Sequence, residues 1–354
     1  MRALKSLLSP EVALLPIIKS DAYGHGLLPV ARILAEEGVY GFGLSEVSEA
    51  LRLKEEAGLN LPMVLISGFE RHWLPEIVHH QFIPVITDLW QLEALASYTA
   101  SRESPCSIHL KVNTGMNRFG LQEEEFEEAL RLLLENPQLR LEGLMSHLCC
   151  SERPEDPVTK EQLIRFENFK KRLKKRGFKP KFFHVANSGG IIFLPQAHYN
   201  MVRPGIALYG SYPAPEGEEK IKLAPVMTFY SRILSIKKIK AGEYLGYGPL
   251  FKAERPMKIA LVPVGYEDGY LRALSNKGFA VVMGQRVPVI GAVSMKCLFL
   301  DVTAIEGLSL QEKVILLGGP RREVPAEELA ERAGTISYEL FCLIGQRALR
   351  VYKE

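Results

Sequence analysis

The sequence of 354 residues lacks the features that mark several specialised classes of protein. Its five cysteines form no Cys-x-x-Cys pair and show no metal-ligand spacing, which argues against a disulfide framework or a zinc motif. No stretch reaches the roughly 20 apolar residues that a membrane-spanning helix needs. The N-terminus has no signal-peptide pattern. We therefore expect reduced thiols and a cytoplasmic location.

The sequence also lacks a large excess of positive or negative charge. The formal net charge of +3 arises from 44 basic and 41 acidic side chains, which gives no reason to expect a nucleic-acid or membrane partner. What is present is an ordinary globular composition, with 47% hydrophobic and 24% charged residues. Because the chain is too long for one ordinary core, we expect two domains.

A repeated alternation of short apolar runs and longer amphipathic stretches occupies residues 14–210. The runs with strand character are 14–18, 41–44, 63–66, 83–86, 108–112, 141–145, 182–185 and 201–208. The segments between most of them show helical spacing. Strand and helix repeated in this way predict a (β/α)8 barrel over residues 1–212, with an open doubly wound sheet as the alternative.

A polar segment that contains proline and glycine, residues 213–220, separates this region from one rich in β-structure. The expected strands are 226–239, 258–264, 279–283, 287–293, 298–302 and 314–317. One helix is expected among them, at residues 326–332. The sequence therefore predicts a mainly β C-terminal domain over residues 221–354.

Two charge runs inside the barrel region have a structural interpretation. The acidic run 123–125 suits the N-terminus of a helix, where the helix dipole favours carboxylates. The basic run 170–176 suits the end of a helix that begins near Pro157 and stops at Gly177. A nucleic-acid surface is the less favoured interpretation of the basic run.

A lysine directly follows the first apolar run. Burial near a strand end disfavours the charged form of Lys19, which suits Schiff-base chemistry, although most lysines at such places are solvated loop residues. Tyr23 follows the same strand, and the residues singled out at or after other strand ends are Lys111, Asn113, Arg118, His147, Asn187, Ser188, Arg203 and Gly205. The carboxyl ends of barrel strands meet at one mouth, so these residues predict a site for a ligand that carries phosphate or carboxylate.

Several motifs, taken in order, resemble those of the alanine racemases, fold-type III enzymes that use pyridoxal 5′-phosphate (PLP). In the barrel they are IKSDAYGHG at 18–26, LKVNTGMNRFG at 110–120, MSH at 145–147, ANS at 186–188 and MVRPGIALYG at 201–210. In the C-terminal region they are GYG at 246–248, VGYEDG at 264–269 and ISYE at 336–339. The resemblance covers essentially the whole chain.

The resemblance implies an enzyme that interconverts L-alanine and D-alanine and supplies D-alanine for cell-wall peptidoglycan. Lys19 would hold PLP and move a proton on one face of the substrate, while Tyr247 of the partner subunit would serve the other face. The enzyme would therefore be a homodimer with shared active sites. His147 is matched to the histidine that interacts with that tyrosine. Arg203 is matched to the partner of the PLP pyridine nitrogen, where a guanidinium donates a hydrogen bond but practically never a proton, and this favours racemisation over transamination.

The resemblance also implies the binding residues. Phosphate contacts are expected from Tyr23, Ser188, Gly205, Ile206 and Tyr338. Arg118 would bind the substrate carboxylate, and Met295 would contribute backbone near it. Lys111 is matched to a lysine that is often carbamylated in the family, and no metal is expected.

The sequence departs from the family pattern at three places. The chain begins inside the family's first helix, so either its start is truncated or the C-terminal domain lacks one strand. Ala292 and Lys296 stand where the family has an arginine and an aspartate, which leaves open a racemase of broader range that accepts serine or a basic amino acid. Cys149 and Cys150 replace small residues, and we expect buried structural thiols there. A non-catalytic PLP-binding protein is the alternative from another class.

Overall fold

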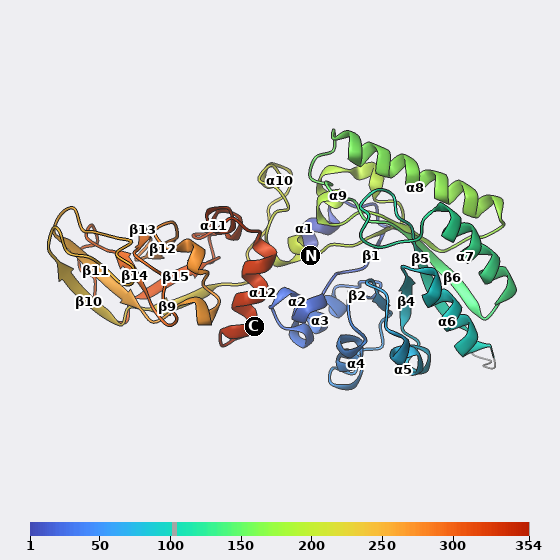
Figure 1. Cartoon of the computed structure of the whole chain (residues 1–354), viewed down its shortest axis with the longest axis horizontal. Helices are drawn as coiled ribbons and strands as arrows, with labels where there is room; N and C mark the ends of the chain where they lie inside the picture. The colour runs from blue at the N-terminus through green and yellow to red at the C-terminus, as the bar shows by residue number, and fades with distance from the viewer. Residues whose placement is uncertain (101–104, 354) are drawn as a thin grey trace. The chain divides into compact units, whose positions relative to one another are not determined.

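The computed structural model describes residues 1–100 and 105–353, which divide into two compact units (Figure 1). The first unit comprises residues 1–22, 27–208 and 213–222. The second comprises residues 23–26 and 209–212 and the described residues from 223 onward. Among the described residues, no helix combines the length and the apolarity needed to cross a membrane.

Parallel strands form the centre of the first unit. They are β1 (Ala13–Leu14), β2 (Phe42–Leu44), β3 (Met63–Leu65), β4 (Ile83–Ile86), β5 (Cys106–Lys111), β6 (Leu139–Met145), β7 (Phe182–His184) and β8 (Met201–Val202). Strands β2 to β7 pair in sequence order, and β1 pairs with β8. Backbone hydrogen bonds from Gly43 to Pro16 (2.8 Å) and from Arg203 to Ala186 (2.9 Å) join these two groups. The predicted (β/α)8 barrel is thereby confirmed.

The first unit also contains helices, most of which surround these strands (Figure 1). They are α1 (Arg2–Lys5), α3 (Leu27–Glu36), α4 (Val47–Glu55), α5 (Leu74–His79), α6 (Leu89–Thr99), α7 (Glu123–Glu135), α8 (Pro157–Lys175), α9 (Ser188–Phe193) and α10 (Gly217–Lys220). Helix α7 illustrates packing through one apolar face. Its buried residues Phe126, Ala129, Leu130 and Leu133 follow helical spacing and so lie on one side of the helix. The barrel interior is filled by apolar side chains that include Leu15, Val64, Val85 and Met201.

The two charge runs of the barrel have the structural roles that the sequence predicted. Glu123 to Glu125 lie in the first turn of α7. Arg172 on α8 donates to Glu127 at 2.8 Å and to Glu123 at 2.9 Å, so the basic run of one helix pairs with the acidic face of the other. Gly177 ends α8 at a φ of +85°.

The second unit contains an antiparallel sheet (Figure 1). Its strands are β9 (Phe229–Arg232), β10 (Ser235–Ile239), β11 (Met257–Val262), β12 (Phe279–Val282), β13 (Gln285–Ile290), β14 (Leu298–Asp301) and β15 (Lys313–Leu317). Their order across the sheet is β10, β11, β14, β13, β12, β15, β9. The helices of this unit are α11 (Ala326–Ala333) and α12 (Ser337–Arg347). The prediction of a mainly β region after the barrel is confirmed.

Three expectations about elements were wrong. Strand β8 ends at Val202 instead of residue 208, since Pro204 lacks a backbone N–H, and Ile206–Tyr209 form a 3₁₀ helix. The expected strand 226–239 is two strands, because β9 pairs with β15 whereas β10 pairs with β11. The second helix of this unit, α12, was missed, although its buried residues Leu340, Phe341 and Ile344 have helical spacing.

Candidate active site

Lys19 begins a turn of left-handed helix, α2 (Lys19–Tyr23), that follows the first strand. Ser20, Asp21 and Ala22 have φ between 53° and 54°, and Tyr23 continues the turn at 55°. Each L-residue in this conformation costs about 1–2 kcal/mol, so the turn stores strain directly beside Lys19. Strained backbone of this kind clusters at functional sites.

Two carboxyl groups hold this left-handed turn. The backbone N–H of Asp21 donates to Glu49 Oε1 at 3.2 Å, and Asp21 Oδ1 accepts from the backbone N–H of Leu27 at 2.7 Å. Glu49 also accepts from Ser45 N at 3.3 Å. Burial raises the pKa of Glu49, whereas the backbone N–H donors oppose that rise. Glu49 is therefore a positioning residue that the sequence did not reveal.

The side chain of Ser188 accepts hydrogen bonds from backbone N–H groups near the ends of β7 and β8. Its Oγ accepts hydrogen bonds from Gly205 N at 2.9 Å and from Ala207 N at 3.2 Å. Asn187 caps α9, since its Oδ1 accepts from Gly190 N at 3.0 Å. In barrels these two strand ends often bind phosphate, so the geometry suits the roles predicted for Ser188 and Gly205.

Arg203 lies in the interior of the barrel with 2% of its surface exposed. Nη1 donates to His184 O at 2.8 Å, and Nη2 donates to Ser146 O at 2.7 Å and to Val185 O at 3.1 Å. His147 Nδ1 lies 3.3 Å from Nη2. Burial lowers the pKa of Arg203 to about 9, so the guanidinium remains a cation at neutral pH.

Two buried histidines extend the network from Arg203. Arg203 Nη1 lies 2.9 Å from His184 Nδ1, and His184 Nε2 lies 2.9 Å from His109 Nδ1. Burial, followed by the charge of Arg203, lowers the pKa of both histidines, that of His109 to about 3. Both rings are neutral, and because a guanidinium can only donate, His184 carries its proton on Nε2 and donates to His109. A Cβ on Gly143 would lie 2.6 Å from His109 Nδ1, so glycine makes room for the ring.

Sequence reasoning missed His109 and His184. The available signal was period-two spacing, since His109 precedes Lys111 by two residues in β5 and so projects from the same face of the strand. A histidine inside an apolar strand usually has a buried partner. That partner could not be identified from β5 alone.

Lys111 ends β5 with 5% of its surface exposed. Burial is the largest cause that lowers its pKa, to about 7, and the neighbouring cations Arg203, Arg118 and Lys19 lower it further. Burial and the same cations hold the pKa of His147 well below its usual value, so its imidazole is neutral. The structure thus brings together these five predicted residues of the first unit.

Arg118 lines a cavity of about 700 Å³ in the first unit. Asn113 and Thr87 also line the cavity, and Trp73 and Trp90 contribute aromatic surface to it. The cavity exceeds the size of a small amino acid. Arg118 is the one cation among the described residues that line the cavity, which also include the carboxylates Glu46, Glu70, Asp88 and Glu125. The lining as a whole therefore does not favour an anion, and the carboxylate-binding role of Arg118 stays a prediction from the motif match.

Of the remaining predicted residues, Ile206 lies in the first unit, whereas the second unit contains Tyr23, Tyr338, Tyr247 and Met295. Tyr23 is buried, and its ring centroid lies 5.7 Å from that of Tyr338. Burial raises the pKa of Tyr23, so its phenol remains a neutral donor. Tyr247 lies between β10 and β11 with 74% of its surface exposed, and Met295 lies between β13 and β14 with 54% exposed. The carbonyl of Met295 accepts from Glu267 N at 3.1 Å.

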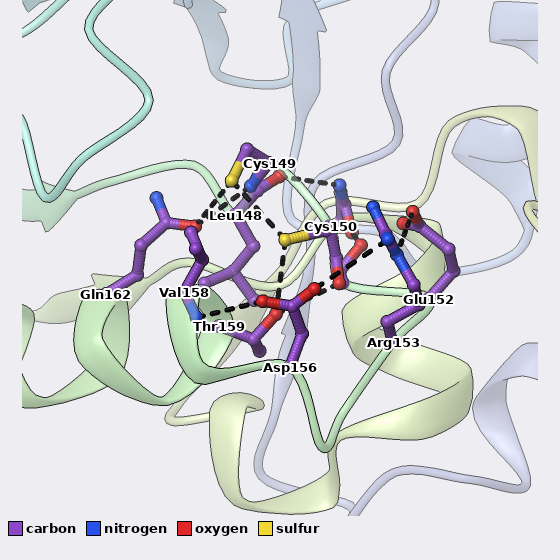
Figure 2. Close-up of polar contacts among 11 residues, drawn as sticks. Leu148, Cys149, Cys150, Glu152, Arg153, Asp156, Val158, Thr159 and Gln162 are labelled. Atoms are coloured by element: carbon purple, nitrogen blue, oxygen red, sulfur yellow. Dashed lines mark hydrogen bonds and ion pairs between the residues drawn. The ribbon is translucent and has the colours of Figure 1, made fainter.

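One expectation about the cysteines was wrong. Cys150 is buried, but Cys149 is exposed. Both lie in the loop between β6 and α8, and such connections run over the surface (Figure 2).

Comparison with known families accounts for nearly the whole chain. Residues 1–213 match the family described as "Alanine racemase, N-terminal domain", and residues 226–352 match "Alanine racemase, C-terminal domain". The chain belongs to the alanine racemase family. The resemblance inferred from the motifs is therefore confirmed.

Individual members of the alanine racemase family show how close the similarity is. The alanine racemase of Syntrophobacter fumaroxidans is 40% identical over 98% of this chain and 92% of its own length. That of Sorangium cellulosum is 39% identical over 96% of this chain and 91% of its own. The solved alanine racemase from Streptomyces coelicolor A3(2) has a TM-score of 0.93 at 33% identity, covering 99% and 94% of the two chains. These relatives confirm the predicted fold and the predicted class of enzyme, an isomerase.

Proposed function

We propose that this protein interconverts L-alanine and D-alanine with the help of PLP. The observation that carries the proposal is the cluster of Lys19, Lys111, His147 and Arg203 in the first unit, where burial and the neighbouring cations lower the pKa values of Lys111 and His147. Family membership supports alanine as the substrate. The individual roles below rest on this cluster and on the motif matches.

The residues present suit PLP. When bound, PLP supplies an electron-accepting ring that makes the hydrogen on the substrate α-carbon acidic. Lys19 would hold it through the amine. Ser188 and the backbone N–H of Gly205, which here donates to Ser188 Oγ, would be donors to the phosphate, and the motif match adds Ile206, Tyr23 and Tyr338.

Arg203 sets the character of the site. It is a cation with carbonyl and imidazole partners on both terminal nitrogens, so it is fixed in place before any ligand arrives. We propose that it donates a hydrogen bond to the pyridine nitrogen without transferring a proton. The neutral His184 cannot supply that proton either. This arrangement favours racemisation over transamination.

Racemisation requires a proton to leave one face of the α-carbon and another to arrive on the opposite face. We propose Lys19 Nζ for one face and the phenol of the partner's Tyr247 for the other. Support comes from the high exposure of Tyr247 on its own chain, which leaves the side chain available to a second copy. A phenol has a reference pKa of about 10, so nearby cations must lower it for catalysis near neutral pH. His147, which is neutral, would hydrogen-bond that phenol.

Arg118 would bind the substrate carboxylate, with the backbone of Met295 near it. We further propose that Lys111 is carbamylated, which would replace a cation with an anion beside Arg118 and Arg203. The product D-alanine would serve peptidoglycan synthesis in the cytoplasm, where the five free cysteines would remain reduced. In this account residues 1–212 hold the cofactor and residues 221–354 contribute to the partner's site.

The test is a racemase assay on alanine, serine and lysine with a parallel absorbance scan for bound PLP. We expect rapid interconversion of alanine, and we expect Lys19→Ala to abolish both the turnover and the covalent cofactor band. If Lys19→Ala retains both, the proposal is wrong. Faster turnover of serine or lysine than of alanine would establish the broader racemase.

The structure and the family match also bear on the two alternatives, a racemase of broader range and a non-catalytic PLP-binding protein. A broader specificity would act through Ala292 and Lys296, and Lys296 donates to Asp268 at 2.9 Å and lies 3.4 Å from Glu267, which neutralises much of its charge. A non-catalytic PLP-binding barrel would have no use for the C-terminal domain that the chain matches. Both observations favour the alanine racemase.

A further inference from the structure

Two adjacent thiols stand in the loop between β6 and α8, outside the set of residues assigned to catalysis (Figure 2). The Sγ atoms of Cys149 and Cys150 are 3.5 Å apart. Cys149 is exposed and Cys150 is buried, so the pair can be reached from solvent through the first thiol. The remaining cysteines have no such neighbour of their own kind in sequence.

Side chains of α8 hold both thiols in this arrangement. Gln162 Oε1 accepts from the backbone N–H of Cys149 at 3.0 Å and from its Sγ at 3.2 Å. Thr159 Oγ1 donates to Cys150 O at 3.0 Å and lies 3.5 Å from Cys150 Sγ. Gln162 and Thr159 are both buried, so the two sulfurs are organised by a rigid support.

Direct oxidation of this pair to a disulfide is disfavoured by geometry. A disulfide requires sulfurs about 2.05 Å apart and Cα atoms about 4.4–6.8 Å apart. Neighbouring Cα atoms across a trans peptide are only about 3.8 Å apart, so the bond would be strained. The observed S···S distance of 3.5 Å instead leaves room for one bridging atom.

We propose that Cys149 and Cys150 form a binding site for organic compounds of trivalent arsenic that carry two exchangeable ligands. Zinc normally takes four ligands, and the described residues contain no group of three or more His, Cys, Asp or Glu side chains able to hold a metal. A ligand that needs only two sulfurs fits this site, and soft thiophilic atoms select thiol ligands.

The binding step balances without any redox partner. With phenylarsine oxide, the two S–H bonds and the arsenic–oxygen bond break, two As–S bonds form, and the oxygen leaves as water with both thiol protons. Arsenic remains trivalent throughout. Burial and the hydrogen bond with Cys150 raise the pKa of the Cys149 thiol, so the protons that the departing oxygen needs are present. The second bond is intramolecular, which makes the complex far tighter than one with a single thiol.

The experiment titrates the full-length protein with phenylarsine oxide and measures intact mass and the number of free thiols. We expect one equivalent bound per chain, two thiols lost, release by 2,3-dimercaptopropanol and persistence in excess 2-mercaptoethanol. Cys149→Ser and Cys150→Ser should each weaken binding by roughly 10²–10⁴-fold, the gain that linking two contacts provides. No substrate or cofactor turnover enters the measurement, so its result is independent of the proposed racemase activity.

The matched control is Cys297→Ser, which removes a half-buried cysteine elsewhere in the chain. It should bind phenylarsine oxide as the unaltered protein does. Wild-type affinity in Cys149→Ser would overturn the proposal, as would equal weakening in Cys297→Ser. Circular dichroism of each variant shows that the fold is retained, and Cys149→Ser, at an exposed position, is the decisive variant.

Discussion

At the scale of single residues, the site depends on buried charges whose neighbours set their protonation. Arg203, Lys111 and His147 share one environment, in which burial lowers all three pKa values and neighbouring cations lower those of Lys111 and His147 further. The sequence identified all three from their places at strand ends. It could not reveal that Lys111 would have a pKa near 7, because that value depends on burial and on partners from other strands.

The pKa of Lys111 predicts reaction with carbon dioxide. Only the neutral amine forms a carbamate, and with a pKa of about 7 the neutral fraction rises steeply as the pH passes from about 6 to about 8, whereas a solvated lysine with a pKa of about 10.4 stays charged throughout. Carbon-13 NMR in labelled bicarbonate should therefore show a carbamate signal of Lys111 that grows over this range, separate from any signal of the N-terminal amine, whose pKa burial also lowers. The signal should be missing in Lys111→Ala. A signal that is equally strong in that variant, or none at all in the unaltered protein, would contradict the prediction.

Arg203 should matter for stability as well as for activity. Arg203→Met leaves the carbonyls of Ser146 and Val185 without this donor, whereas the carbonyl of His184 keeps the backbone N–H of Ser146 at 3.2 Å. Each buried acceptor that is left unsatisfied costs about 1–3 kcal/mol. We expect Arg203→Met to have a clearly lower thermal midpoint of unfolding, which calorimetry measures. Arg203→Lys keeps a cation with three hydrogen-bond donors, so its thermal midpoint of unfolding should fall less than that of Arg203→Met. Equal midpoints for Arg203→Met and the unaltered protein would show that the network is not stabilising.

At the scale of elements, the strand ends were predictable and the left-handed turn was not. Hydrophobic periodicity placed Lys19 after the first strand. Nothing in the letters Ser-Asp-Ala-Tyr announces a left-handed turn, since glycine is the usual signal and none of the four is glycine. One of the two carboxyl groups that hold the turn belongs to Glu49, which lies 28 positions beyond Asp21 and supplies an acceptor that the local sequence does not show.

Glu49 therefore gives a test of this turn. Glu49→Ala removes the acceptor for Asp21 N and Ser45 N and should lower both the stability, by about 1–3 kcal/mol, and the rate of turnover, because Lys19 loses its fixed backbone. Glu49→Gln keeps one oxygen acceptor and should recover part of both. Urea unfolding and the racemase assay measure the two effects. If Glu49→Ala and Glu49→Gln behave alike and neither variant reduces turnover, the carboxylate of Glu49 does not position Lys19.

At the scale of the whole molecule, the barrel and the β-rich region followed from alternation of apolar runs. The errors came from tertiary choices. β9 and β10 are consecutive in sequence, yet they pair with different strands, and no local pattern specifies which. The pairing of His109 with His184 likewise joins residues 75 positions apart. Long-range contacts of this kind complete the site, and no local pattern indicates which residues make them.

The central claim is that Lys19 and the partner's Tyr247 act on opposite faces of one substrate, and mixed dimers test it most directly. Lys19→Ala and Tyr247→Phe are each prepared, shown to be inactive alone, and then unfolded, mixed in equal amounts and refolded. Random pairing in a two-fold dimer gives mixed dimers with one intact site, so about a quarter of the wild-type activity should return. Failure of the mixture to recover any activity, while the unaltered protein refolds to full activity under the same conditions, would contradict the account.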